Sequence, residues 1–239
     1  MDSRYATRLA GSSVAWRRAL SLVLAVACVA LLGGCASARP GVAAQVGSSR
    51  ITLAEVDEAS VNLCKAFLPQ IETEGGTYPL KVLSGFVVGS LTRQAIARQV
   101  ADELGIKTPA TYADQVAAVE AAAEQIAAEV RETYLELSIA GPYADAIMLE
   151  AGRQALADEG VAEAPPEEQM VRGQRVFAAW VEENQVEIDP RYSLQVVEGN
   201  VVAADTSTSV AVSPAALTGQ AEQMDPAAAA QLPSSQRCN

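Results

Sequence analysis

The sequence predicts a mainly α-helical fold, with about five helices in one domain and short β-strands at both ends of that domain. Between residues 52 and 183, apolar residues recur at helical spacing, and capping residues, prolines and glycines divide them into separate runs. Before and after that region, short apolar segments flank turn residues, which is typical of strands. A length of 239 residues is sufficient for such a domain.

The first predicted elements are a strand, a turn and a second strand within residues 44–51, followed by a helix. Thr52 and Glu55 have the spacing of a capping box, so the helix is predicted to begin at Thr52. Pro69 lacks a backbone N–H and is predicted to end this helix. Residues 72–77 contain two glycines and are predicted to form a loop.

A second helix is predicted from about Pro79 to Leu104, with Gly105 closing it. A third is predicted to begin at Thr108-Pro109 and to break at Gly141-Pro142. Its apolar positions follow three-four spacing: Val116, Val119, Ala123, Ile126, Val130 and Leu137. This seam is narrow and rich in alanine, so it favours a close antiparallel hairpin with a neighbouring helix over a dimeric zipper.

The fourth helix is predicted over about residues 143–158, ending at Gly160, and the fifth begins at Pro165-Pro166. Phe177, Trp180 and Val181 form the predicted core face of the fifth helix. Extended chain is predicted from residue 186. It includes a hairpin around Glu198-Gly199-Asn200 and a further extended segment at 209–213.

Residues 1–34 have the features of a bacterial lipoprotein signal peptide. Four arginines precede a 14-residue apolar run, residues 19–32, which is short for a membrane-spanning helix. The run ends in Leu32-Gly33-Gly34-Cys35, and small residues before a cysteine match a lipobox. Cys35 is therefore the predicted lipidation site, carrying acyl chains such as palmitate. The alternative is an ordinary signal peptide with an incidental cysteine.

This interpretation divides the chain into four parts. After the signal peptide, residues 35–43 are predicted to be a flexible tether. Residues 44–213 form the predicted domain, and residues 214–239 form a tail that is predicted to be disordered unless Cys238 is bridged. The predicted location is the extracytoplasmic face of the cell membrane, reached through the lipid anchor.

Two cysteines, Cys64 and Cys238, remain once Cys28 leaves with the signal peptide and Cys35 carries lipid. An exported protein meets oxidising conditions, in which a disulfide is plausible. The sequence leaves two alternatives open, namely a bridge between these cysteines, or a buried Cys64 and a free thiol in the tail. Two cysteines without histidine make a poor metal site, and no cofactor is predicted.

Composition excludes several classes of function. The chain has no histidine, which removes serine–histidine and cysteine–histidine catalysis and imidazole zinc sites. The formal charge is −12. Loss of the signal peptide removes four of the 17 basic and one of the 29 acidic residues, leaving 13 basic and 28 acidic and a net charge of −15. A chain this acidic is a poor candidate for binding nucleic acid.

Three adjacent acidic pairs, Asp57-Glu58, Glu167-Glu168 and Glu182-Glu183, are interpreted as solvated helix faces, because neighbours on a helix point about 100° apart. The segment Asp189-Pro190-Arg191-Tyr192 either docks a partner or, as we favour, forms a structural turn. Four aromatic residues are core candidates that could instead line an apolar groove: Phe67, Phe86, Phe177 and Trp180. No catalytic residue is predicted.

Two segments resemble the N-terminal domain of SurA-like extracytoplasmic chaperones. The first is residues 46–57, a short strand, a glycine turn and a capped helix. The second is residues 91–106, a long helix ending in Leu104-Gly105-Ile106, after which a proline-capped helix follows. The resemblance covers residue 44 to about residue 130. It implies a helical module that binds unfolded envelope proteins in a groove between helices.

Many members of that family also carry a parvulin-type prolyl isomerase domain, for which this chain has no room between its third and fifth predicted helices. The leading hypothesis is therefore a lipid-anchored chaperone-like protein that binds unfolded or exported polypeptides without catalysis. The alternatives are an envelope adaptor that docks one specific partner and, third, a prolyl isomerase.

Overall fold

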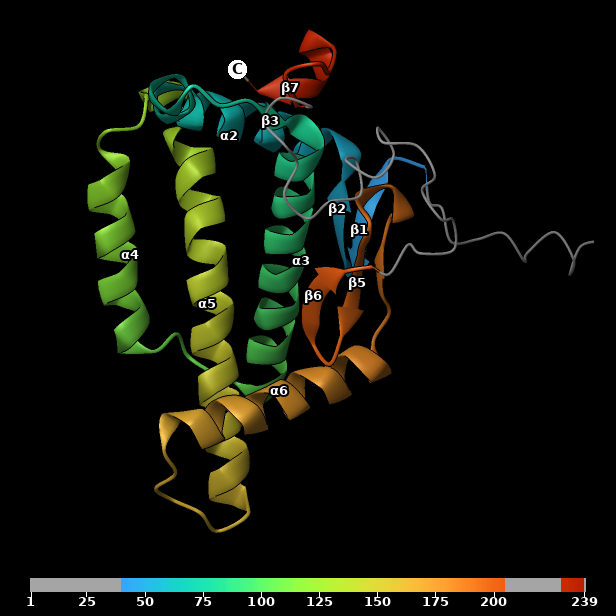
Figure 1. Cartoon of the computed structure of the whole chain (residues 1–239). Coiled ribbons are helices and arrows are strands. Elements are labelled where there is room, and N and C mark those ends of the chain that lie inside the picture. The colour runs from blue at the N-terminus through green and yellow to red at the C-terminus, as the bar shows by residue number, and fades with distance from the viewer. Residues whose placement is uncertain (1–39, 205–228, 239) are drawn as a thin grey trace, which may run out of the picture. The chain divides into compact units, whose positions relative to one another are not determined.

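A computed structural model describes residues 40–204 and 229–238 (Figure 1). The chain divides into two units at Pro40, and the described elements belong to the second, Gly41–Asn239. They confirm the mainly α class, with five helices: α2 (Leu53–Glu74), α3 (Leu80–Leu104), α4 (Ala110–Ala123), α5 (Ala128–Asp158) and α6 (Pro166–Glu183). Helices α3, α4 and α5 stand side by side, and α6 crosses one end of α3 and α5 (Figure 1).

Short strands precede the helical region, β1 (Val42–Val46) and β2 (Ser49–Thr52), and follow it, β4 (Val186–Ile188), β5 (Leu194–Val197), β6 (Asn200–Ala203) and β7 (Arg237–Cys238). One further strand, β3 (Tyr78–Pro79), lies between α2 and α3. One antiparallel sheet has the order β2-β1-β4, in which Ala44 pairs with both Ile51 and Ile188. This sheet fastens the start of the domain to its end. The tether boundary at residue 43 was wrong, because Val42 and Ala43 belong to β1 and Ala43 is fully buried.

The start of α2 is confirmed in its atomic detail. The Glu55 N–H donates to Thr52 Oγ1 at 3.2 Å, and the Thr52 N–H donates to Glu55 Oε2 at 2.6 Å. Both members of the capping box therefore satisfy a backbone donor that the helix itself leaves free.

The predicted end of α2 at Pro69 was wrong, since the helix continues to Glu74. Pro69 removes one hydrogen bond, to the Lys65 carbonyl, but the next turn places Ile71 in the core. Gly75 then ends the helix at φ +67°, and the Gly76 N–H donates to Ile71 O at 3.0 Å. Burial of Ile71 and this cap offset the bond lost at Pro69, so the predicted loop begins later than residue 72.

The division of the third and fourth helices was also wrong. The chain breaks at residues 124–127, between α4 and α5, and α5 runs without interruption through Gly141-Pro142. Ala140 and Ala144, on either side of that dipeptide, are fully buried, which favours a continuous helix there. At the actual break, the Arg131 guanidinium donates to Glu124 O and Ile126 O, which satisfies carbonyls that the ending helix leaves free. Helices α4 and α5 form an antiparallel hairpin within the segment that was predicted to be a single helix, so the seam predicted from Val116 to Leu137 is divided between them and its pairing with a neighbouring helix was wrong.

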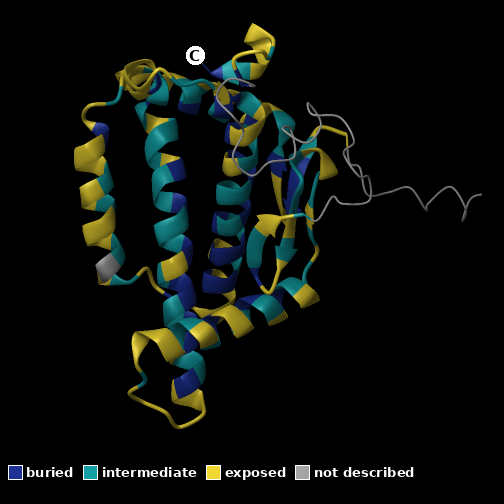
Figure 2. Cartoon of the chain, in the orientation of Figure 1, coloured by how far each residue is buried: buried dark blue, intermediate teal, exposed yellow. Residues whose placement is uncertain are grey.

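Two groups of buried side chains form the core. Buried positions recur along α3 and α5 (Figure 2). One group fills the space between α3, α5 and α6 and includes Ile96, Ile147 and Phe177. The other lies under β1, α2 and α3 and includes Val56 and Val87. Together they hold α3 between the sheet and α5, so that the exposed face of α3 has a fixed orientation.

The C-terminal hairpin β5–β6 is confirmed. Its two turn residues, Glu198 and Gly199, have φ values of +50° and +77°, as expected for a type I′ turn. The segment Asp189–Tyr192 is a structural turn: the Arg191 N–H donates to Asp189 Oδ1 at 2.9 Å, and Arg191 Nε lies 3.1 Å from Asp189 Oδ2. The predicted extended segment at 209–213 lies outside the described residues.

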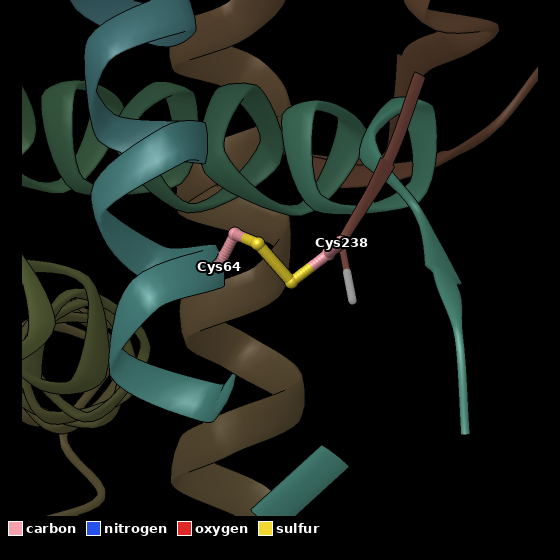
Figure 3. The surroundings of a disulfide bond; sticks show 2 residues. All are labelled: Cys64 and Cys238. Carbon is pink, nitrogen blue, oxygen red and sulfur yellow. A yellow bond between two sulfur atoms is a disulfide. The ribbon is translucent and has the colours of Figure 1, made fainter. Parts of the chain in front are cut away.

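A disulfide joins Cys64 in α2 to Cys238 in β7 (Figure 3). Of the two alternatives that the sequence left open, the structure contains the bridge. Strand β7 also pairs with β3, with Cys238 opposite Tyr78. Within the predicted tail, residues 229–238 are thus structured, and residues 214–228 lie outside the described part of the chain.

None of the helices in the described part of the chain has the length and apolar character that crossing a membrane requires. Cys35 and residues 1–34, the predicted signal peptide, are outside the described residues.

Candidate functional site

Helix α3 presents two large apolar side chains on its outer face. Val82 and Phe86 are 51% and 52% exposed, and they lie one helical turn apart on the same side of the helix. Leu83 and Val87 are one position further along the helix and are buried in the core. The core therefore covers one face of α3 and leaves Val82 and Phe86, here called the apolar ridge, in contact with solvent.

A cavity of about 350 Å³, the α2–α3 pocket, lies on one side of the apolar ridge. Leu63, Phe67 and Ile71 of α2 form its opposite wall, with Gln70, Glu74 and Tyr78 as its polar lining. The Phe67 ring meets the Tyr134 ring edge to face at 6.2 Å between centroids, which fixes its orientation. The disulfide fastens this region, because Cys64 follows Leu63 and Cys238 pairs with Tyr78.

A wider hollow of about 790 Å³, the α3–α5 groove, lies on the other side of the apolar ridge. Gly85, Gly89 and Gly141 line it, and side chains of Leu194 and Val201 from the C-terminal hairpin close its far wall. A Cβ built on Gly85 would meet no atom within 4 Å. Because glycine has no side chain, these positions leave the groove open beside Phe86.

The lining of the α3–α5 groove carries few charged groups. The Arg93 guanidinium pairs with the Asp145 carboxylate, which leaves Lys81 as the remaining cation of the lining. Burial raises the pKa of the Tyr192 phenol above its ordinary value; Asp57 raises it further and Arg191 opposes this. Tyr192 therefore presents a neutral phenol to the groove at physiological pH. Both hollows suit apolar chain with neutral polar groups better than a charged ligand.

The four aromatic groove candidates divide into two pairs. Phe67 and Phe86 line the α2–α3 pocket. Phe177 is fully buried in the core, so its assignment to a groove was wrong. Trp180 is 7% exposed and packs in the same core, and its edge lines a separate hollow of about 300 Å³ between α3 and α6. The indole Nε1 of Trp180 donates to Glu103 Oε2 at 2.9 Å, which satisfies its polar group at the edge of the core.

Val82 is a groove residue that the sequence analysis missed. Its signal is present in the chain, since Val82 and Phe86 are four residues apart and are interleaved with Leu83 and Val87. An apolar stripe that contains both the Val82–Phe86 pair and the Leu83–Val87 pair is wider than the surface that packing against one core can bury.

The acidic pairs are exposed, as expected of solvated helix faces. Across the described ranges, no three Cys, Asp or Glu side chains are grouped closely enough to hold a metal ion.

Comparison with known proteins gave no match to any family model, curated protein or solved structure. The resemblance to SurA-like chaperones therefore stays a prediction from the sequence.

Proposed function

We propose that this protein is a lipid-anchored extracytoplasmic chaperone-like protein that binds unfolded or exported polypeptides without catalysis. The observation that carries the proposal is the apolar ridge, where half-exposed Val82 and Phe86 separate two hollows. A polypeptide segment lying across the ridge would place apolar side chains on both sides of Phe86.

The energetics of such a surface suit weak and unselective binding. Full burial of one Val or Phe side chain contributes about 1.5–3 kcal/mol. Ordering an extended segment opposes much of this gain, so two ridge residues and the pocket walls support reversible binding. Glycines in the groove allow the client backbone to approach α3 closely without demanding one side-chain shape.

The anchor follows from the sequence at Cys35. Acyl chains there would hold the acidic domain close to a membrane whose anionic head groups repel it. The anchor and the electrostatic repulsion together would keep the apolar ridge available for polypeptides near the membrane. Substitution Cys35→Ala should abolish incorporation of a fatty-acid probe, and retained labelling would refute the lipid anchor.

Suppression of aggregation tests the binding function. A chain beginning at about Arg39 should reduce light scattering when an unfolded model protein is diluted from denaturant. No effect at a stoichiometric dose would count against the proposal. A proline-isomerisation assay on a short peptide should give no rate above background.

The acidic character of the domain favours a second candidate, an adaptor that docks one basic partner in the envelope. Crosslinking would then recover a single partner, and its binding would weaken steeply with salt. Binding of many unfolded clients with little salt dependence favours the chaperone-like function instead.

A further inference from the structure

A third cavity, of about 340 Å³, lies where β2, α2, α3 and α5 meet, and it is here called the polar pocket. Its apolar walls include Ile51, Leu91 and Leu137. Apart from these and two alanines, its lining is polar or charged, unlike that of the α2–α3 pocket. The volume is at the lower end of the range of about 300–1,000 Å³ that is usual for sites of small organic ligands.

Gln94 of α3 lines the polar pocket and is only 5% exposed. Its side-chain amide makes no hydrogen bond with any residue that the structure describes. The amide end is the part of the residue that reaches the pocket, because neither of its polar atoms is among the fully buried, unpartnered side-chain atoms of the described residues. The side chain therefore offers a donor and an acceptor to a molecule inside the pocket.

Charged groups of both signs surround Gln94 in the lining of the polar pocket. Arg50 and Arg98 supply guanidinium groups, and Glu58 and Glu136 supply carboxylates; the carboxylate of Glu55 also lines the pocket but accepts from the Thr52 N–H in the capping box. None of these four takes part in the ion pairs found within the described residues. Arg50 is oriented through its Nε, which donates to Gln45 Oε1 at 3.2 Å and leaves its terminal nitrogens for another acceptor.

We propose that the polar pocket binds a zwitterionic dipeptide. The arginines suit its carboxylate, because guanidinium groups bind carboxylates through paired hydrogen bonds. Glu58 and Glu136 suit its ammonium group. The Gln94 amide suits its peptide bond, to which it can donate one hydrogen bond and from which it can accept another.

This inference does not rest on the proposed chaperone-like function, because the apolar ridge and the polar pocket are different sites. The two ligand classes also differ. An internal segment of an unfolded polypeptide carries neither terminal charge, whereas the polar pocket requires both charges on one small molecule.

Calorimetric titration of the full chain, purified in detergent, with alanyl-leucine tests the inference. One dipeptide should bind per chain. N-acetyl-alanyl-leucine and alanyl-leucinamide, which each lack one terminal charge, should bind about ten-fold or more weakly. No binding of alanyl-leucine, or equal binding of the blocked forms, would overturn the proposal.

The variant Gln94→Met distinguishes a ligand contact from a structural role. Methionine fills a similar volume without a polar group, so the variant should keep or increase its resistance to denaturant. It should lose about ten-fold or more in alanyl-leucine affinity. Undiminished affinity in this variant would show that Gln94 does not contact the ligand. Glu136→Gln, at an exposed position, provides a second variant that should weaken alanyl-leucine binding while leaving the fold intact.

Discussion

Gly152 of α5 and Gly173 of α6 lie at the closest approach of those two helices. A Cβ built on Gly173 would be 1.9 Å from Met148 O, and one built on Gly152 would be 1.8 Å from Gln169 O. Each obstacle is a backbone atom, which cannot move aside as a flexible side chain can. The two glycines thus permit the crossing that places α6 across the ends of α3 and α5 (Figure 1).

The first prediction concerns this crossing. Gly152→Ala and Gly173→Ala should each lower the free energy of unfolding by about 3 kcal/mol, at the upper end of the usual cost of overpacking. Chemical denaturation measures the loss. Gly85→Ala is the matched control, because its Cβ meets nothing and alanine is the better helix former, so it should stabilise by about 0.5–1 kcal/mol. Equal effects of the three substitutions would contradict this account.

Removal of the disulfide is the second prediction. The bridge closes a loop between residues 174 positions apart, so the double substitution Cys64→Ala and Cys238→Ala should cost about 2–4 kcal/mol of unfolding free energy. Reductant should bring the native chain close to the level of the double variant and leave that variant unchanged. Equal stability of the two chains would show that the bridge does not restrain the unfolded state.

The third prediction separates binding from stability at the apolar ridge. Phe86→Ser should weaken suppression of aggregation, because it removes the side chain between the two hollows, with about a ten-fold loss in affinity for unfolded clients. Its effect on unfolding should be only about 1 kcal/mol, since Phe86 is half exposed and loses about half of the free energy of a fully buried side chain. Val171→Ser on α6, at 49% exposure, is the matched control and should retain full activity. A similar loss in both variants would point to general surface hydrophobicity.

The fourth prediction is a pH dependence from the Tyr112–Tyr143 pair, whose rings meet at 5.5 Å. Burial raises the pKa of both phenols above the ordinary value of 10.0; Tyr143 raises that of Tyr112 further, and Arg98 opposes the shift at both. Well below pH 10 both phenols keep their protons in the folded and unfolded states, so their contribution to stability does not change with pH. Above pH 10 the unfolded state loses its protons first, and the free energy of unfolding falls until the folded pKa is passed.

Denaturation on either side of pH 10 measures this slope. Tyr143→Phe should flatten it, whereas Tyr78→Phe, at an exposed position, should preserve it. A slope that is unchanged in Tyr143→Phe would mean that other groups dominate the alkaline loss of stability.

The features that were predicted correctly from the sequence depend on residues close together in the chain. The Thr52–Glu55 capping box, the end of α3 at Gly105 and the Glu198-Gly199 turn each depend on residues adjacent in the chain. Pro69 misled because burial of Ile71, a tertiary effect, outweighs the local cost of proline in a helix. The pairing of β1 with β4 joins segments more than a hundred residues apart, which no local pattern encodes.

The candidate sites show the same limit. Phe86 and Phe177 both lie on apolar helix faces, and only the neighbouring helices decide that one is half exposed and the other buried. Gln94 is a polar residue on a long helix, and sequence patterning alone would place such a residue in solvent. Its burial beside Leu91 and Leu137 becomes visible only once α2, α3 and α5 are assembled.

The most direct measurement replaces Phe86 with a photoreactive aromatic residue and irradiates the chain in the presence of an unfolded model polypeptide. The same residue placed at Val171 serves as the reference position. We predict crosslinks to the polypeptide from position 86 that are several-fold stronger than those from position 171 and that disappear once the client has folded. Equal crosslinking from both positions, or none from position 86, would contradict the assignment of polypeptide binding to the apolar ridge.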